Sequence, residues 1–281
     1  MHWGTSGLRE AQVAFLRSFL DDPELVADDS WGLLDTRVLH VRDAAGEYVV
    51  KASGPDNAHF PRELAAHRDG WTEVLGAQTS RLIAADADAR VLVLERLPGR
   101  LALGTPHEDD ADLHRQAGAV LRRFHDQSAQ EDRRYLHRER DKVLRLLGQP
   151  HRIDAATAER TRALFEDYAP GPAMVVPTHG DWHPRNWLVH RGRLLAIDYG
   201  RFAIRPAATD CTRLAVLYWE HHPELERAFL DGYGSDPRHP EDWRWLQLRE
   251  AVGTAVWAYA VHDETFEAQG HRMLRDALTA F

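Results

Sequence analysis

Cysteine is nearly absent from this chain of 281 residues, which contains only Cys211. A single cysteine excludes an intrachain disulfide and any metal site built from several thiolates, and it fits a reducing compartment. The residues around Cys211 have a helical pattern, so we expect its side chain to be a small buried hydrophobic group.

Long apolar runs are also missing, because no stretch approaches the roughly 18 residues that a membrane-spanning helix needs. The first amphipathic segment carries Glu10 and Arg17, which a secretory signal peptide would not. We therefore expect a cytoplasmic protein. A formal net charge of −9 disfavours nucleic acid as a partner, since phosphates require a basic surface. This acidity suits a cationic small molecule, or else it serves only solubility.

Lysine is the third scarce residue, since only Lys51 and Lys142 occur among 35 lysines and arginines. An ammonium is a compact charge on a thin stem, and it fits where a planar guanidinium would not. Lys51 lies in EYVVKAS, a strand pattern, whereas Lys142 lies on the charged face of a predicted helix. Lys51 is therefore a candidate functional residue.

The periodicity of the chain changes near residue 109. Before it, the pattern predicts a helix at 7–21, a hairpin at 36–53, a helix at 60–75 and a strand at 90–99. After it, the pattern is mostly helical, apart from short apolar runs between Met174 and Asp198. We expect an α+β fold with a small lobe at residues 1–98 and a larger, mostly helical lobe at 99–281.

The segment THGDWHPRNWLV, residues 178–189, places the carboxylate of Asp181 and the amide of Asn186 on one loop. A second carboxylate, Asp198, follows twelve residues after the amide. Oxygen-bearing side chains at this density suit a hard cation such as Mg²⁺.

Zinc bound by histidine is the alternative, because His179 and His183 lie four residues apart. Gly180 and Pro184 argue that this segment is not helical, so the spacing does not stack the two rings on one face. Zinc is therefore the weaker interpretation.

The sequence HGDWHPRN, followed by LLAIDYG, resembles the catalytic and metal loops of the aminoglycoside phosphotransferase family, small-molecule relatives of the protein kinases. The family pattern is HGD, often HP, then N, with a downstream IDxG. The resemblance extends over nearly the whole chain. It implies a bilobal protein-kinase-like fold, with an antiparallel sheet plus helices in the N-lobe and ATP and Mg²⁺ as cofactors.

Carried over from this resemblance, Asp181 is the catalytic base or orienting group for the substrate hydroxyl, and Asn186 and Asp198 are the Mg²⁺ ligands. Phosphoryl transfer needs mainly an aligned nucleophile and cations over the phosphates, which these residues would supply. His179 is expected to hydrogen-bond the loop backbone.

The same resemblance gives the nucleotide-binding residues. Lys51 reaches the α- and β-phosphates and is held by Glu63, while the Glu95 carbonyl and the Leu97 amide bind adenine. Ser30, with the amides near Trp31 and Gly32, is the candidate phosphate-covering segment.

The chain departs from the family after Asp198. Arg205 and Pro206 lie near the position where relatives usually carry a Gly-Asp-Pro turn. Arg185 stands where a glycine is frequent, and either contacts an anion or is merely solvated.

The acceptor site is expected in the C-lobe, where HEDDAD at 107–112 and HDETFE at 262–267 are acidic. The first cluster also suits a helix start. Asp263, Glu264 and Glu267 of the second are the candidate substrate residues, since carboxylates bind ammonium groups.

These features predict an O-phosphotransferase for a hydroxyl of a small cationic antibiotic, giving resistance. Aminoglycosides come first, and cyclic peptides of the capreomycin and viomycin kind second. A metabolic kinase for choline, homoserine or a sugar is the main alternative. A pseudokinase is disfavoured, because it needs no base and fewer metal ligands.

Overall fold

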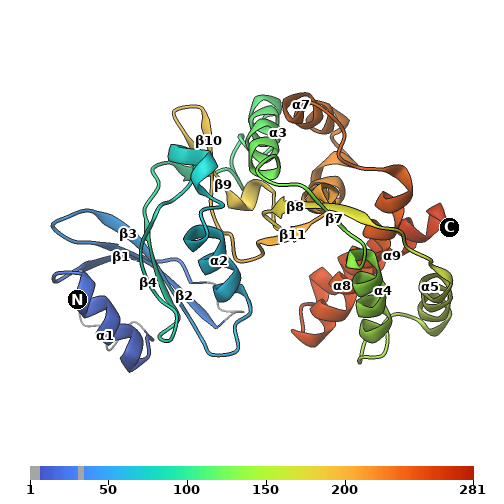
Figure 1. Cartoon of the computed structure of the whole chain (residues 1–281), viewed down its shortest axis with the longest axis horizontal. Helices are drawn as coiled ribbons and strands as arrows, with labels where there is room; N and C mark the ends of the chain where they lie inside the picture. The colour runs from blue at the N-terminus through green and yellow to red at the C-terminus, as the bar shows by residue number, and fades with distance from the viewer. Residues whose placement is uncertain (1–6, 31–34) are drawn as a thin grey trace.

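The computed structural model describes residues 7–30 and 35–281. Figure 1 shows the N-terminal sheet with helices α1 (Glu10–Phe19) and α2 (His59–Arg68) at one end of the molecule and most of the helices at the other end. Helix α3 and several short strands lie between these parts.

The described chain forms helices and strands in mixed order. The α-helices are α1 (Glu10–Phe19), α2 (His59–Arg68), α3 (Ala111–His125), α4 (Tyr135–Leu146), α5 (Ala155–Asp167), α6 (Thr212–Leu214), α7 (Pro223–Tyr233), α8 (Pro240–Ala260) and α9 (Glu264–Ala277). Short 3-10 or π turns are η2 (Glu73–Gln78), η3 (Pro184–Asn186), η4 (Ala207–Cys211), η5 (Ala215–Trp219) and η6 (Leu278–Ala280). The strands are β1 (Glu24–Asp28), β2 (Thr36–Arg42), β3 (Glu47–Ser53), β4 (Leu82–Asp86), β5 (Val91–Glu95), β6 (Arg100–Leu101), β7 (Gln130–Asp132), β8 (Ala173–Thr178), β9 (Trp187–His190), β10 (Arg193–Ala196) and β11 (Ala203–Arg205).

A five-stranded antiparallel sheet in the order β1-β2-β3-β5-β4 forms the N-terminal part. Strand β5 is a continuous apolar run because both of its faces are covered. Val91 and Val93 pack with α1, whereas Leu92 and Leu94 pack with Phe60 of α2. The predicted helix at 7–21 and hairpin at 36–53 are observed as α1 and as β2 with β3.

The register of the sheet decides where Lys51 points. Lys51 of β3 is directly opposite Leu92 of β5, and opposite residues share a face of the sheet. Leu92 packs against α2, so the Lys51 side chain also extends toward α2. The same helix carries Glu63, which is buried.

The predicted helix at 60–75 is two elements. Helix α2 ends at Arg68, and the chain continues through Gly70, which has φ +81°, before η2 begins. Glycine adopts this left-handed conformation without the strain of a side chain. The turn redirects the chain so that Thr79 pairs with Ala196, which links the N-terminal part to β10.

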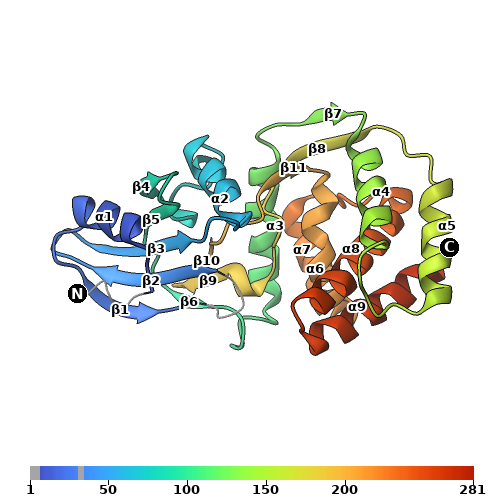
Figure 2. The ribbon, with the colours of Figure 1, turned by 90° about the horizontal axis from the view of Figure 1, so that it is seen from below.

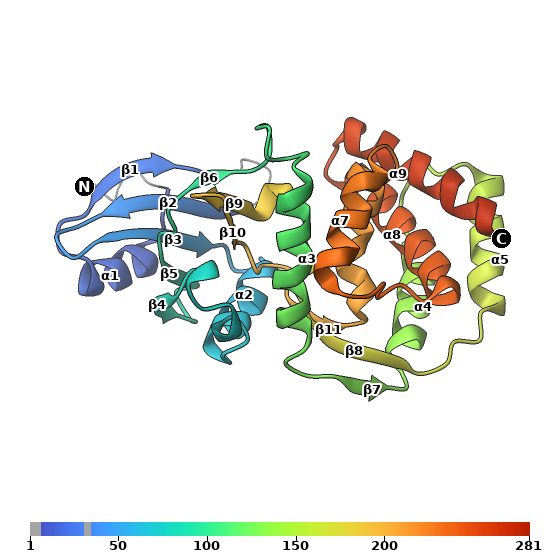
Figure 3. The same cartoon turned by 90° about the horizontal axis from the view of Figure 1, so that it is seen from above.

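Helices α3 and α7 lie side by side in the C-terminal part (Figure 3). Glycines allow the close approach: a Cβ on Gly118 would lie 2.1 Å from the Phe229 carbonyl oxygen, and one on Gly232 would lie 1.8 Å from that of Arg115. Cys211 is fully buried nearby, which confirms its prediction as a small core residue.

Two small sheets connect the helices to the sequence motif. Strands β9 and β10 form a hairpin with β6 at its edge, and β8 lies between β7 and β11 (Figure 2). The loop that contains Asp181 and Asn186 leaves the end of β8 and enters β9. In the part of the chain that the structure describes, no helix is both long and apolar enough to cross a bilayer.

Replacing Gly232 by alanine should destabilise the fold by about 3 kcal/mol, because the new methyl group would overlap the α3 backbone and force α3 and α7 apart. Gly253→Ala is the matched control, since a Cβ at Gly253 of α8 meets nothing within 4 Å. The control should be neutral or stabilising by up to about 1 kcal/mol. Denaturant unfolding of both variants measures the difference, and equal effects would contradict the close packing.

Candidate active site

One ammonium group joins two carboxylates from distant parts of the sequence. The Lys51 Nζ lies 2.7 Å from Glu63 Oε1 and 3.0 Å from Asp198 Oδ1. Glu63 comes from α2, and Asp198 follows β10. The structure therefore connects the face of the N-terminal sheet to the motif IDYG.

The charges of this triad are coupled. Burial alone would lower the pKa of Lys51, but the carboxylates of Asp198 and Glu63 outweigh it and the pKa lies above its ordinary value. Burial opposes ionisation of Asp198, yet the Lys51 ammonium holds the pKa of this carboxyl below its usual range. Lys51 and Asp198 are thus a charged pair at neutral pH.

The backbone at Asp198 has a conformation that few residues other than glycine adopt. Its φ is +68°, in the left-handed region, where aspartate and asparagine are better tolerated than most side chains. Asp198 Oδ1 also accepts a hydrogen bond from the Gly200 amide at 3.4 Å. The turn presents the carboxylate, whose side chain remains 44% exposed, beside Lys51.

The motif HGD requires its glycine. Gly180 has φ +82°, and a Cβ there would lie 2.3 Å from the carbonyl oxygen of Arg201. The segment after β10 therefore packs directly on the loop after β8. This contact places Asp181 next to the segment that follows Asp198.

A buried carboxylate fixes the same loop from behind. Asp210 accepts hydrogen bonds from the backbone amides of His179 at 2.8 Å and Gly180 at 2.5 Å. His125 Nε2 lies 3.0 Å from Asp210 Oδ2. Burial disfavours the charge, but the hydrogen bond from His125 and the other nearby donors keep the pKa of Asp210 below its ordinary value.

His179 binds the loop backbone with both ring nitrogens. Its Nδ1 accepts from the Asp181 amide at 3.3 Å, which leaves Nε2 to donate to the Ile197 carbonyl at 3.0 Å. Burial lowers the pKa of this imidazole, so it is neutral. The side chain ties the loop of Asp181 to the strand end that precedes Asp198.

Asp181 is surrounded by donors. Asn186 Nδ2 donates to its carbonyl oxygen at 2.7 Å and to Oδ2 at 3.1 Å. Arg213 Nε lies 2.8 Å from Oδ1, and His183 Nε2 lies 3.4 Å from the same atom. Burial would raise the pKa of Asp181, but Arg213, His183 and Arg201 bring it well below the ordinary value.

Two side-chain oxygens, one of Asn186 and one of Asp198, are suited to bind a cation. Because Asn186 donates through Nδ2, its Oδ1 is its remaining ligand atom, and no described residue binds it. Asp198 Oδ2 is likewise without a partner among residues 7–30 and 35–281. Within those ranges no three of His, Cys, Asp and Glu gather as a preformed metal site. The residues therefore fit a cation such as Mg²⁺ that takes its other ligands from phosphate and water.

The segment after β5 contains the two residues predicted to bind adenine. Glu95 pairs through its carboxylate with Arg81 at 2.8 Å, and its amide donates to the Arg81 carbonyl. Leu97 is buried, and no described residue accepts a hydrogen bond from its amide. The main chain at Leu97 thus keeps a free donor.

Ser30 lies in the turn between β1 and β2. Its hydroxyl oxygen accepts from the Val38 amide at 3.0 Å, and its own amide donates to Asp28 Oδ1 at 3.0 Å. Trp31 and Gly32, the other residues of the predicted phosphate-covering segment, lie outside the described residues.

The three predicted substrate acids have contacts around α9. Asp263 caps the helix by accepting from the Phe266 amide at 2.9 Å. The buried Glu267 lies 3.3 Å from Arg152, and Glu264 lies 4.0 Å from the same arginine. The exposed Glu264 is the one most accessible to a solute.

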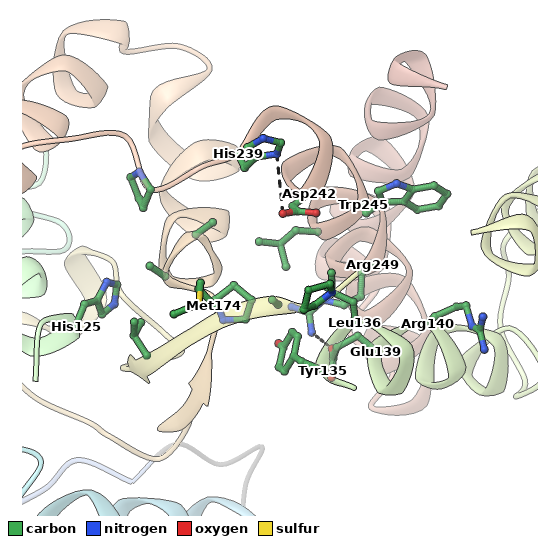
Figure 4. A pocket seen from close by; sticks show the side chains of 18 of the residues that line it. His125, Tyr135, Leu136, Glu139, Arg140, Met174, His239, Asp242, Trp245 and Arg249 are labelled. Atoms are coloured by element: carbon green, nitrogen blue, oxygen red, sulfur yellow. Dashed lines mark hydrogen bonds and ion pairs between the residues drawn. The ribbon is translucent and has the colours of Figure 1, made fainter. Parts of the chain in front are cut away.

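A cavity of about 520 Å³ opens elsewhere in the C-terminal part, between α4, β8 and α8. Figure 4 shows Arg249 and Glu139 in contact on its wall, with Trp245 and Tyr135 among the aromatic lining. Asp181 is not among its lining residues. The cavity is therefore separate from the candidate active site around Asp181.

Sequence reasoning missed the residues that fix the loop, above all Asp210, His125 and Arg213. Asp210 lies outside both motifs, and its sequence position indicates only a helix start. Arg213 is one of many arginines, and nothing in its sequence neighbourhood distinguishes it. The periodicity of a helix does not report which loop its polar residues contact.

The comparisons with known proteins agree with this geometry. Residues 29–248 match the model of APH, the phosphotransferase enzyme family. The match spans most of the chain, which therefore belongs to this family. No curated protein sequence matches the chain.

Several solved structures share the fold. Choline kinase LicA from Streptococcus pneumoniae is 15% identical, with a TM-score of 0.66 over 95% of this chain and 97% of that one. Amicoumacin kinase hAmiN, solved with AMP-PNP, Ca²⁺ and Ami, is 15% identical, with a TM-score of 0.65 over 98% and 96%. An aminoglycoside-3'-phosphotransferase of type VIII is 24% identical, with a TM-score of 0.60 over 86% and 99%.

These matches confirm the predicted family and the bilobal protein-kinase-like α+β fold, and they confirm that the chain is a phosphotransferase of the small-molecule kinase kind. At identities below 25%, the similar structures establish the fold and leave the acceptor to be identified by other means.

Asp210→Asn should unfold the loop locally and lower the free energy of unfolding by about 2–4 kcal/mol. The amide that replaces one carboxylate oxygen would face the backbone N–H of His179 or Gly180, so a donor would meet a donor. Denaturant unfolding measures the loss. The exposed Asp126→Asn is the control, and a loss as small as in that variant would show that Asp210 does not hold the loop.

Proposed function

We propose that this chain is an ATP- and Mg²⁺-dependent O-phosphotransferase that phosphorylates a hydroxyl group of a small molecule. The observation that supports it most is the contact of the Lys51 ammonium with both Glu63 and Asp198. This arrangement places a fixed cation and a carboxylate with a free oxygen side by side, as transfer from a nucleoside triphosphate requires.

The nucleotide is proposed to bind between an N-lobe of residues 1–98 and a C-lobe of 99–281. The free amide of Leu97 and the carbonyl of Glu95 would bind the adenine edge, and Ser30 would lie over the phosphates. Lys51, held by Glu63, would contact the α- and β-phosphates. Because Glu63 is buried and paired, Lys51 is restricted to one direction before nucleotide arrives, which lowers the entropic cost of binding.

Asn186 and Asp198 are proposed to hold Mg²⁺, which when bound neutralises charge on the phosphates. Hydrogen bonds from Asn186 Nδ2 to Asp181 fix the amide plane and so orient its Oδ1. Asp198 is already ionised at neutral pH, so cation binding there requires no proton release.

Asp181 is proposed to orient the acceptor hydroxyl. Its pKa is well below the ordinary value, so it is ionised at any working pH but is a weak proton acceptor. Such a carboxylate aligns the O–H with the γ-phosphorus and accepts the proton late. The acceptor oxygen then forms its bond to phosphorus, the bond to the bridging oxygen breaks, and ADP leaves.

For the acceptor, the sequence prediction of a small cationic antibiotic, with resistance as the outcome, is part of this proposal. The exposed Glu264, next to Asp263 and Glu267, supports binding of an ammonium group. A metabolic acceptor is the second candidate, because a choline kinase has a similar fold over 95% of the chain. In either case we propose a cytoplasmic enzyme.

A coupled assay of ADP release separates these candidates. The panel contains aminoglycosides, capreomycin, viomycin, choline, homoserine and simple sugars, each with saturating ATP and Mg²⁺. Turnover of antibiotics alone would support a role in resistance. Turnover of metabolites alone would contradict that role.

Asp181→Asn should reduce kcat by about 10²–10⁴-fold, because the amide no longer accepts the hydroxyl proton. ATP affinity should stay within a few-fold of the unmodified protein, since the Asp181 backbone carbonyl, which the substitution leaves in place, still accepts the hydrogen bond that orients Asn186. Single-turnover kinetics and calorimetry measure the two quantities. The exposed Asp167→Asn is the control, and an unchanged rate in Asp181→Asn would remove the residue from this role.

Asp198→Asn should weaken ATP binding about 10-fold or more in the presence of Mg²⁺ and much less in its absence. Asparagine tolerates the positive φ of this position, so the substitution removes charge with little strain. Isothermal titration with and without Mg²⁺ measures the effect. An equal loss under both conditions would argue that Asp198 acts only through Lys51.

A further inference from the structure

Three arginines gather around the loop that carries Asp181, and we call them the arginine cluster: Arg201, Arg205 and Arg213. Arg201 follows the IDYG motif, Arg205 ends β11 and Arg213 lies in α6. All three are half-buried. Figure 2 shows α6 next to α8, and the two helices are in contact.

Contacts within the cluster connect it to the catalytic loop. Arg213 Nε lies 2.8 Å from Asp181 Oδ1. Arg205 Nη2 donates to the carbonyl of Arg201 at 3.0 Å, and the same carbonyl lies over Gly180. Arg213 and Arg201 therefore act on the Asp181 carboxylate, and Arg205 adjoins them through the Arg201 carbonyl.

The cluster has fewer carboxylates than arginines. Asp181 and Glu250 of α8 are the acids of the described residues that act on Arg201. Burial and the neighbouring charges of Arg213 and Arg205 disfavour the charged form of Arg201 and lower its pKa, although it stays protonated. Glu139 acts on Arg205 but is paired with Arg249, the residue before Glu250, and Arg249 also lies 3.4 Å from Glu250. With Arg249 counted, four arginines share these three acids.

Much of the donor capacity of the cluster is unused. Within residues 7–30 and 35–281, the guanidinium of Arg201 has no hydrogen-bond or ion-pair partner, and that of Arg205 binds only a carbonyl. A guanidinium has five N–H donors in a planar fork that matches an oxyanion. Positive charges that lie close together repel one another when too few carboxylates neutralise them, and a bound anion reduces this repulsion.

We propose that the arginine cluster binds an anionic oxygen group of the acceptor, a carboxylate or a phosphate, beside the hydroxyl that is phosphorylated. This inference rests on the proposed function and specifies its substrate class as a hydroxy acid or a phosphorylated alcohol. Of the acceptors considered above, homoserine has such a group, whereas choline and unmodified aminoglycosides do not. An amine elsewhere on the acceptor is compatible with the acids of α9.

The nucleotide is the other source of an anion. Its phosphates have their own binding groups in Lys51 and in the cation that Asn186 and Asp198 would hold, whereas Arg213 contacts Asp181 directly. An anion bound by the arginine cluster would therefore lie next to the acceptor hydroxyl that Asp181 is proposed to orient. Experiments must separate the two sources, and saturating Mg·ADP does so by filling the nucleotide site.

The first experiment measures sulfate binding to the full chain by calorimetry, with saturating Mg·ADP present. The unmodified protein should bind one sulfate, and Arg205→Gln should bind it about 10–100-fold more weakly. Arg152→Gln, which changes an arginine next to Glu267, is the matched control and should bind as the unmodified protein does. No sulfate binding, or binding that Mg·ADP abolishes, would overturn the proposal in favour of the nucleotide phosphates.

The second experiment uses acceptor pairs that differ by one anionic group: homoserine with 3-amino-1-propanol, glycerate with ethylene glycol, and glucuronate with glucose. The anionic member should have a kcat/KM at least about 10-fold higher, and Arg205→Gln should remove this preference mainly through KM. Equal or better turnover of the neutral members would overturn the inference and leave the proposed function intact.

Failure of the proposed function has a different signature. In that case Mg·ATP does not bind, and no acceptor of any charge releases ADP. Circular dichroism and denaturant unfolding should show that Arg205→Gln is folded, so that a loss of sulfate binding reports the guanidinium itself.

Discussion

The whole site depends on one ammonium shared between two carboxylates. Lys51 extends from the middle of the sheet to the face that α2 covers, where Glu63 meets it, and it reaches across to Asp198. Glu63 lies on the helix that follows and Asp198 is 147 residues away, so the pairing forms only when the sheet, α2 and the turn after β10 are all in place. An arginine has a wider head group and would not fit this narrow space between two acids.

A second layer of interactions fixes the loop that carries Asp181. Asp210 binds two consecutive backbone amides, and His179 connects the loop to the strand end before Asp198. Asp210 is a buried charge, and it makes the loop rigid because each backbone amide that it binds would otherwise lack a hydrogen-bond partner. The carboxylates of Asp181 and Asp198 are therefore held by backbone contacts more than by each other.

Much of this fold could be predicted from the sequence, because strong patterns mark α1, the β2–β3 hairpin and β5. Strands β1 and β4 are not predicted from pattern, since they are the edges of the sheet, and Leu25 and Val26 of β1 are both 39% exposed. The motif located Asp181, Asn186 and Asp198. It could not show that α6 would bring Arg213 to the carboxylate, because that contact is set by tertiary packing.

The contact at Gly180 makes the shape of the catalytic loop independent of which side chain occupies position 201. Arg201 touches this glycine through its main-chain oxygen, so the shape of the loop is indifferent to the side chain at position 201. Residue identity there is consequently free to vary while the aspartate next to the glycine stays in place. A descendant enzyme could therefore change the side chain at position 201 while the backbone that holds Asp181 keeps its shape.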